Sequence, residues 1–444
     1  MTSCSSSSYT VQDVTPTKGE MMSEAIEKAT AAKAAAALLA QSSAAERTDA
    51  ILSAAQSVSD GRDRILAANG ADMQRARANG MPGPMLDRLM LDDARIDGIV
   101  SAMREVAGQP DPIGEVVGGR TLASGIRLTQ VRVPLGVIGM IYEARPNVTA
   151  DAICLTMRTG NAVVLRGGSA ARESCKAIVE ACRSGIAAAG LPQDAACLLE
   201  SEGHEQTIEL MHADGLVDLI IPRGGHSLIR TCVEQSSVPV IQTGEGNCHV
   251  YVHAAADPDM ALRIIENAKV QRPGVCNAIE TVLVDQSISL EFIPMLVKAC
   301  ASWGVTVHGD EHVTSVARHM GLAEGTQFSA ATTADWACEY DALELAVRVV
   351  SGLDEAIDHI NTYGTKHSEC IVTNEVPAAD AFLARVDAAA VYVNASTRFT
   401  DGGMFGLGAE IGISTQKLHA RGPMGALALT TTKCLLRGEG QVRA

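Results

Sequence analysis

Aromatic residues are scarce in this sequence, which has only two Trp, six Tyr and five Phe among its 444 residues. Any core must therefore be packed mainly from Ala, Val, Ile and Leu. Hydrophobic residues still make up 47% of the chain and charged residues 20%, a balance that excludes intrinsic disorder as the main state. A chain of this length has room for two or three domains.

Basic residues are outnumbered, with 36 Lys and Arg against 52 Asp and Glu, a net charge of −16. Such a surface repels nucleic acid and anionic membranes, so we expect neither as a partner. Long apolar runs are also missing, since stretches such as Val133–Ile141 have only the length of a strand. The start of the chain has neither the charged nor the apolar region of a signal peptide. We therefore expect a flexible tail over residues 1–18 and a cytoplasmic protein.

The twelve cysteines lack the spacing of a disulfide framework or a metal site, with no CxxC pair among them. A reducing compartment and mostly buried thiols are the simplest interpretation. The histidines near the motifs described below are His226, His249 and His367, and none has metal-ligand spacing. We therefore predict no bound metal.

The chain changes its pattern twice. Residues 19–109 are typical of helices, with apolar residues three and four apart in Ala31–Leu39 and Ala44–Ala55. Residues 113–133 then alternate around a turn that contains glycine, which predicts a β-hairpin. An isolated two-stranded ribbon is marginal in water, so we expect this hairpin to pack on another element, such as a second subunit.

After Pro134, short apolar runs alternate with amphipathic segments of helix length, a rhythm that indicates parallel sheets covered on both faces. The fold class we predict is α/β, with two parallel-sheet domains in series and a β-ribbon. The predicted strands are 136–141, 162–165, 217–221, 238–242, 248–252, 280–284, 306–308, 369–373 and 389–394, and the predicted helices include 171–189, 225–234, 257–270, 290–303 and 353–361.

Cys276 has the most unusual setting of the twelve thiols. It follows a Pro-Gly turn in Gln271-Arg-Pro-Gly-Val-Cys276, just before the strand predicted from Glu280. Connections between elements are where reactive groups are usually displayed. An inert buried thiol is the alternative, and on spacing alone it is the commoner outcome.

Two segments have the composition of phosphate-binding turns. Arg166-Gly-Gly-Ser169 follows one predicted strand and precedes a helix, and Arg223-Gly-Gly225 repeats that arrangement. Glycine lets backbone N–H groups approach a ligand, a helix start favours negative charge, and Arg can hold phosphate with two hydrogen bonds. Either segment alone could be an ordinary turn, but the pair favours phosphate or dinucleotide binding. The Gly-x-Gly-x-x-Gly fingerprint is absent from both.

Three further segments place donors and cations at predicted strand ends, with polarity of solvated loops as the alternative interpretation. They are Tyr142–Asn147, Lys366–Ser368 and Asn394–Arg398. Because the net charge opposes an anionic ligand, local cations must reverse the field, which draws attention to Arg145, Arg223, Lys366 and Arg398.

Longer motifs give a specific resemblance. Residues 133–147, 222–225, 244–249, 271–276 and 399–424 together resemble the gamma-glutamyl phosphate reductase family of the aldehyde dehydrogenase superfamily. The resemblance implies a cofactor-binding domain over residues 19–112 and 134–244 and a catalytic domain over 245–424. It also implies an oligomerisation ribbon over 113–133 and 425–444.

The implied activity is NADPH-dependent reduction of L-glutamyl 5-phosphate to glutamate 5-semialdehyde and phosphate, the second step of proline synthesis from glutamate. The resemblance further implies a homo-oligomer, either a dimer or a tetramer, and functional coupling to glutamate 5-kinase.

The resemblance also implies roles for single residues. Cys276 would be the nucleophile that forms a thioester, and Asn147 is a substitute for the oxyanion Asn of hydrolytic relatives. The cofactor would bind Arg166, Gly167, Gly168, Ser169, Arg223, Gly224, Gly225 and Glu339, and the substrate would bind Arg145, Lys366, Ser396, Thr397 and Arg398.

Two other functions share this fold. A hydrolytic aldehyde dehydrogenase would need a base to activate water, but Thr243 stands where those relatives carry a Glu. An inactive scaffold would keep the fold alone, and the presence of Cys276 and of both Arg-Gly-Gly turns counts against it.

Overall fold

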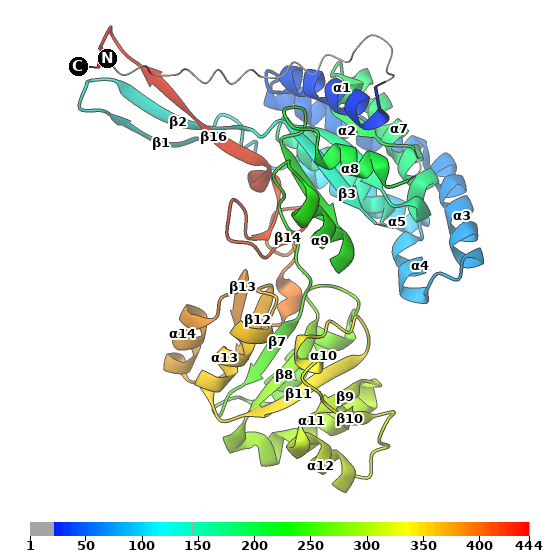
Figure 1. The fold of residues 1–444 in the computed structure, drawn as a ribbon, viewed down its shortest axis with the longest axis vertical. Helices are drawn as coiled ribbons and strands as arrows, with labels where there is room; N and C mark the ends of the chain where they lie inside the picture. The colour runs from blue at the N-terminus through cyan, green and yellow to red at the C-terminus, as the bar shows by residue number, and fades with distance from the viewer. Residues whose placement is uncertain (1–21, 144, 202, 444) are drawn as a thin grey trace, which may run out of the picture.

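The computed structural model describes residues 22–143, 145–201 and 203–443, and the tail predicted over residues 1–18 lies outside them. Two α/β bodies follow one another, and a ribbon of long strands projects from the first of them (Figure 1). The predicted α/β class, with parallel sheets and a ribbon, is therefore confirmed.

The first body begins with the predicted helices, which are α1 (Glu24–Leu39), α2 (Ala44–Asp60), α3 (Arg62–Ala78), α4 (Gly83–Leu89) and α5 (Asp93–Ala107). Ser43 caps α2 in a capping box with Glu46, which satisfies two backbone donors at the helix start. The small residues allow close helix packing. A Cβ on Gly185 of α7 (Arg172–Ala188) would stand 2.5 Å from the main chain of Ala54 in α2.

The first sheet is parallel, in the order β5-β4-β3-β6, and its strands are β3 (Val137–Tyr142), β4 (Ala162–Gly167), β5 (Ala196–Leu198) and β6 (Leu219–Arg223). The helices of this part are α6 (Pro146–Arg158), α7, α8 (Glu205–Met211) and α9 (His226–Gln235). The strand predicted at residues 238–242 is wrong. Pro239 has no N–H to donate, and this segment makes only an isolated bridge to Ile220.

The second sheet has seven parallel strands in the order β10-β9-β11-β8-β7-β12-β13. Its strands are β7 (Cys248–Val252), β8 (Ile279–Asp285), β9 (Thr306–Gly309), β10 (Phe328–Ala330), β11 (Glu344–Val350), β12 (Ser368–Val372) and β13 (Ala390–Val393). Its helices are α10 (Pro258–Val270), α11 (Ser289–Trp303), α12 (Glu311–His319), α13 (Leu353–Tyr363) and α14 (Val376–Arg385). The sequence analysis missed β11, although it lies near the middle of the sheet.

The predicted hairpin is present as β1 (Val116–Thr121) and β2 (Arg127–Pro134). A third strand, β16 (Thr430–Arg437), pairs antiparallel with β2 along its whole length. Most residues of β1 and β16 are exposed, including Val116 and Leu436. Figure 1 shows this three-stranded ribbon reaching away from the first body.

The segment after β13 returns toward the first body and includes the short pair β14 (Ile413–Ser414) and β15 (Gly422–Pro423). It carries Glu410 to Arg223 at the end of β6, where the carboxylate and guanidinium lie 3.9 Å apart. No helix among the described residues is long and apolar enough to cross a membrane.

Candidate active site

Cys276 lies on the turn between α10 and β8, as the sequence predicted, and its side chain is partly buried. The turn is held from the first body, because Arg88 of α4 donates a hydrogen bond of 2.5 Å to the carbonyl oxygen of Gly274. A second contact with the turn comes from Gly246, just before β7. Gly246 packs so closely that a Cβ at this position would overlap the carbonyl oxygen of Cys276. Two other segments of the chain therefore position the turn that carries this thiol.

Charged groups from both bodies surround the thiol. Burial raises the pKa of Cys276 above the ordinary value of a thiol. The guanidinium groups of Arg223 and Arg145 lower that pKa, whereas the carboxylates of Glu410 and Glu339 raise it. The resting thiol is thus mainly protonated at neutral pH. Each of these four residues changes the pKa of the thiol, two of them downward and two upward.

The balance of charge predicts how Cys276 reacts with iodoacetamide. Thiolate is the reactive form, so removing a negative neighbour should speed alkylation at pH 7 and removing a positive one should slow it. We expect Glu410→Gln to lower the thiol pKa and Arg223→Gln to raise it, each changing the rate by about two- to tenfold. The measurement follows the peptide that contains Cys276 by mass spectrometry across a pH series. Equal rates in the two variants would contradict this account.

Residues 396–400 support the same turn. Thr397 donates to the carbonyl oxygen of Asn277 at 2.7 Å, and the Asn277 amide donates to the carbonyl oxygen of Thr400 at 2.9 Å. Arg398 donates to the Asn277 side chain and, at 3.2 Å, to Gln271. Ser396 is buried and accepts the N–H of Arg398 at 3.3 Å. Two of the predicted substrate residues, Thr397 and Arg398, therefore contact the cysteine turn and stabilise it, and Ser396 supports Arg398.

A buried layer lies beneath the turn. The Cys248 thiol donates to the carbonyl oxygen of Cys276 at 3.2 Å and lies 3.8 Å from Nδ1 of His367. Burial lowers the pKa of His367 to about 4, so the imidazole is neutral at pH 7. Glu339, a predicted cofactor residue, accepts the N–H of Gly246 at 2.8 Å. This layer fixes the main chain behind the nucleophile.

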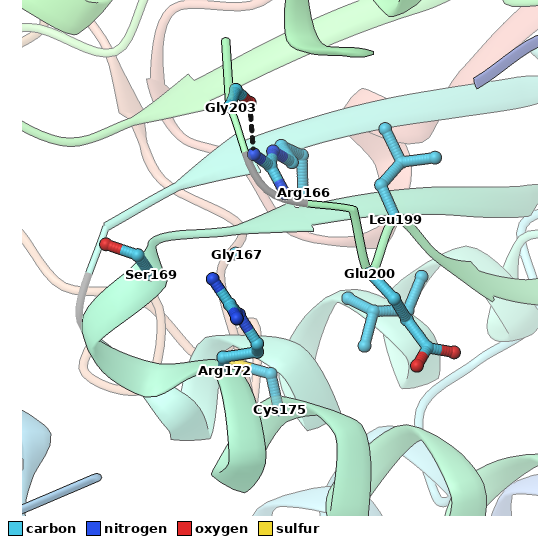
Figure 2. A pocket seen from close by; sticks show the side chains of 9 residues that line it. Arg166, Gly167, Ser169, Arg172, Cys175, Leu199, Glu200 and Gly203 are labelled. Carbon is cyan, nitrogen blue, oxygen red and sulfur yellow. Dashed lines mark hydrogen bonds between the residues drawn. The ribbon is translucent and has the colours of Figure 1, made fainter. Parts of the chain in front are cut away.

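The first Arg-Gly-Gly turn lines a pocket at the carboxyl end of β4, together with Ser169, Arg172 and Glu200 (Figure 2). Arg166 points away from this turn's own backbone and donates to the carbonyl oxygens of Ser201 at 2.8 Å and Gly203 at 2.6 Å. Arg166 therefore holds the rim of the pocket. Arg172, which the sequence analysis did not single out, lies on the first turn of α7 and faces the same pocket.

The second Arg-Gly-Gly turn differs from the first. Gly225 donates its N–H to the carboxylate of Glu143 at 3.1 Å, and Gly224 packs against the same side chain. A negative group thus already lies at the start of α9. The side chain of Arg223 is directed toward Glu410 and influences the Cys276 thiol. We therefore infer that this turn contributes Arg223 to the surroundings of the nucleophile and does not form a second phosphate pocket.

The predicted substrate residue Lys366 and the predicted oxyanion residue Asn147 have carboxylate partners of their own. Lys366 pairs with Asp387 at 3.6 Å, a carboxylate that also binds Lys417 and Arg421, so the structure does not bring its ammonium group to the thiol. Asn147 is exposed on the first turn of α6 and donates to Asp151 at 3.3 Å.

Asp151 itself lies near the thiol's charged neighbours. Burial raises the pKa of this carboxyl to about 7, and Arg223 opposes the increase.

In the part of the chain that the structure describes, no three His, Cys, Asp or Glu side chains form a group that could hold a metal ion.

The sequence analysis missed Arg88, Gly246, Asn277 and Glu410. Gly246 and Glu410 belong to motifs that carried the family resemblance, and Asn277 directly follows the motif 271–276, but the sequence analysis gave none of the three a role. Arg88 had no such signal. Its contact with the cysteine turn joins residues 186 positions apart in the chain.

Comparisons with known proteins show the family to which the chain is similar. The model of the aldehyde dehydrogenase family matches residues 4–321. Gamma-glutamyl phosphate reductase of Moorella thermoacetica is 52% identical over 412 residues, covering 93% of this chain and 97% of that protein. The crystal structure of gamma-glutamyl phosphate reductase from Thermotoga maritima has a TM-score of 0.90 at 43% identity, covering 95% of this chain and all of that one.

More distant structures share the fold alone. An engineered glycolyl-CoA reductase with bound NADP+ has a TM-score of 0.66 at 16% identity, over 93% of this chain and 95% of that one. The chain thus belongs to the aldehyde dehydrogenase family and, within it, to the gamma-glutamyl phosphate reductases, which makes it an oxidoreductase.

Proposed function

We propose that this protein reduces L-glutamyl 5-phosphate to L-glutamate 5-semialdehyde and phosphate with NADPH, the second step of proline synthesis from glutamate. The observation that carries the proposal is the placement of Cys276. A partly buried thiol of the second body lies beside Arg145 and Arg223 of the first body, in a chain half identical to curated gamma-glutamyl phosphate reductases. Those arginines suit a substrate that brings a phosphate and a carboxylate.

The chemistry begins at the Cys276 sulfur, which attacks the acyl carbon after losing its proton. The bond from that carbon to the phosphate oxygen breaks, phosphate leaves, and a thioester remains on the enzyme. The chemistry that NADPH would supply when bound is the hydride that takes the thioester to the level of the aldehyde. The carbon–sulfur bond then breaks, the sulfur regains a proton, and the semialdehyde leaves.

The oxyanion that forms during attack needs hydrogen-bond donors. The backbone N–H of Cys276 is the simplest donor, and we assign Asn147 as the side-chain donor. One of its two amide hydrogens is engaged by Asp151, which leaves the second for the oxyanion. Asp151 would then orient the amide of Asn147.

The cofactor proposal rests on the pocket of Figure 2. Gly167, Gly168 and Ser169 leave the end of β4 in a turn that leads to α7, where backbone donors favour phosphate. Arg172 faces this pocket and would bind the 2′-phosphate that distinguishes NADPH from NADH, whereas Arg166 braces the rim. For the nicotinamide half we assign Glu339 and the turn Arg223, Gly224 and Gly225, which lie on the side of the thiol.

For the substrate we assign Arg145 and residues 396–398, with Thr397 and Ser396 acting through the position of the cysteine turn. Lys366 would reach the substrate only if its ammonium group left Asp387. Arg145 is therefore the principal cation of this assignment.

The position of the catalytic base in hydrolytic relatives holds no base here. Thr243, at the place of the catalytic Glu in hydrolytic relatives, is buried and donates to the carbonyl oxygen of Pro222 at 2.7 Å. A threonine hydroxyl is too weakly basic to take a proton from water at neutral pH. This disfavours the hydrolytic alternative, since an acyl-phosphate reductase must protect its thioester from water.

The proposed reaction can be tested by coupling the protein to glutamate 5-kinase with ATP and glutamate, and by following NADPH oxidation. We expect oxidation that depends on both proteins and yields one phosphate for each NADPH. A kinase-independent rate, or none with an active kinase, would contradict the proposal. A hydrolytic enzyme and an inactive scaffold both predict no oxidation.

We propose that the first body binds the cofactor, the second carries catalysis, and the ribbon joins copies into a dimer or tetramer. Exposed strands with apolar side chains such as Leu436 are costly to leave in water. Deleting residues 427–444 removes β16 and should lower the mass of the assembly measured by light scattering. An unchanged mass per particle, after correction for the shorter chain, would exclude this strand from assembly.

A further inference from the structure

We propose that Glu24, on the first turn of α1, is a positioning residue for the cofactor, because it holds one wall of the pocket that we assign to NADPH. The inference rests on the proposed function and deepens it. Glu24 belongs to none of the motifs that the sequence analysis singled out.

The wall consists of residues 199–201 and 203, which follow β5. Leu199, Glu200 and Gly203 line the pocket at the carboxyl end of β4 together with Arg172 (Figure 2). Between β5 and α8 the described residues form no helix or strand. The place of this pocket wall therefore depends on the partners of its backbone N–H and carbonyl groups.

Both carboxylate oxygens of Glu24 bind the main chain of the pocket wall. Oε1 accepts the N–H of Glu200 at 2.7 Å, and Oε2 accepts the N–H of Ser201 at 2.8 Å. Hydrogen bonds to an ionised carboxylate are stronger than those between neutral groups. Burial raises the pKa of Glu24, but the hydrogen bonds from Glu200 and Ser201 outweigh it, so that this pKa lies below its ordinary value. The acceptor is thus a carboxylate at neutral pH.

Arg166 binds the carbonyl groups of the same wall. Its guanidinium donates to the carbonyl oxygens of Ser201 at 2.8 Å and Gly203 at 2.6 Å, and its Nε donates to Thr207 at 3.2 Å. The pocket wall therefore has two N–H groups on a carboxylate and two carbonyl groups on a guanidinium. Without Glu24, the wall would keep the hydrogen bonds from Arg166 but lose those to its N–H groups, which allows it to shift.

The contacts of Glu24 differ from those of an ordinary acidic residue at a helix start. Such a residue usually stabilises its own helix through the helix dipole. Both oxygens of Glu24 instead bind N–H groups 176 and 177 positions away in the chain. The start of α1 has another acceptor, because the N–H of Ala25 donates to the side chain of Gln206 at 2.8 Å. Glu24 therefore serves the pocket wall more than its own helix.

The direct test is NADPH binding by the full-length protein without substrate, followed by the fluorescence of the nucleotide. We expect Glu24→Ala to raise the Kd for NADPH by about tenfold, since it removes both acceptors. Glu24→Gln keeps one acceptor oxygen, so its Kd should lie between those of Glu24→Ala and the unmodified protein. Glu27→Gln, which changes an exposed carboxylate on the same turn of α1, is the matched control and should bind NADPH normally.

Steady-state kinetics separate a role in cofactor binding from a general loosening of the fold. In the reverse reaction, Glu24→Ala should raise the KM for NADP+, with little change in the KM values for phosphate and semialdehyde. A lower Tm with an unchanged Kd for NADPH would overturn the inference, and so would equal rises in all of these KM values. A Kd that depends on Glu24 in a protein without turnover would instead support the inference and overturn the proposed function.

Discussion

Replacing Cys276 with Ala is expected to abolish turnover, because the acyl intermediate forms on its sulfur and the nearby thiol of Cys248 is fully buried. The loss should lie on the order of 10³- to 10⁶-fold in kcat, as when other covalent nucleophiles are removed. The variant should still fold, since Cys276 is only partly buried and its turn is held through main-chain contacts and neighbouring side chains. NADPH oxidation in the kinase-coupled assay measures the loss.

The control is Cys434→Ala, which removes an exposed thiol on β16 and should leave turnover within twofold of the unmodified protein. Circular dichroism and thermal unfolding of both variants separate lost chemistry from lost folding. More than about a tenth of normal activity in folded Cys276→Ala would remove this residue from the mechanism.

Gly246→Ala should be the next most damaging substitution, even though it adds a single methyl group. That methyl would overlap the carbonyl oxygen of Cys276, which is backbone and cannot rotate away, so the cysteine turn must move. Displacement of a nucleophile by about 1 Å can cost 10²-fold in rate. We expect a loss in kcat of about that size or more, with the KM for NADPH little changed.

Gly98→Ala provides the matched control, because a Cβ on this glycine of α5 meets nothing within 4 Å. Ala also favours a helix more than Gly does, so this variant should be active and at least as stable. If Gly246→Ala kept normal turnover while folded, the contact between Gly246 and Cys276 would not determine the position of the thiol.

Much of the fold could be predicted because the relevant signals are local. The helices of residues 24–107, the hairpin and most parallel strands show their period and their ends in the sequence itself. The cysteine turn was also predictable, since Pro-Gly breaks the chain between an amphipathic helix and an apolar strand.

The misses have tertiary causes. Strand β11 carries Arg348 between apolar residues, which weakens a purely apolar pattern. In the fold this arginine pairs with Glu355 at 2.8 Å and hydrogen-bonds His359 at 2.8 Å. Those partners follow it in the chain, but only the packing of α13 on the sheet brings them to its side chain. Residues 238–242 are apolar enough for a strand, but Pro239 and the isolated bridge to Ile220 prevent a ladder.

The site could be predicted only in part, for a related reason. Motifs mark residues whose chemistry is evident, such as Cys276 and the glycine-rich turns. They do not show that Glu410 returns to Arg223, that Gly225 is bound by Glu143, or that Lys366 pairs with Asp387. Each of these contacts joins segments distant in sequence, and each changes the role that composition alone suggests for the residue.

The central claim is that the thioester on Cys276 is exchanged with phosphate and not with water. The most direct measurement mixes the protein with glutamate 5-semialdehyde and NADP+ in a non-nucleophilic buffer and follows NADPH absorbance with and without inorganic phosphate. We predict NADPH formation only when phosphate is supplied, at a rate that saturates as its concentration rises. Equal rates without phosphate, with free glutamate as the product, would contradict the account.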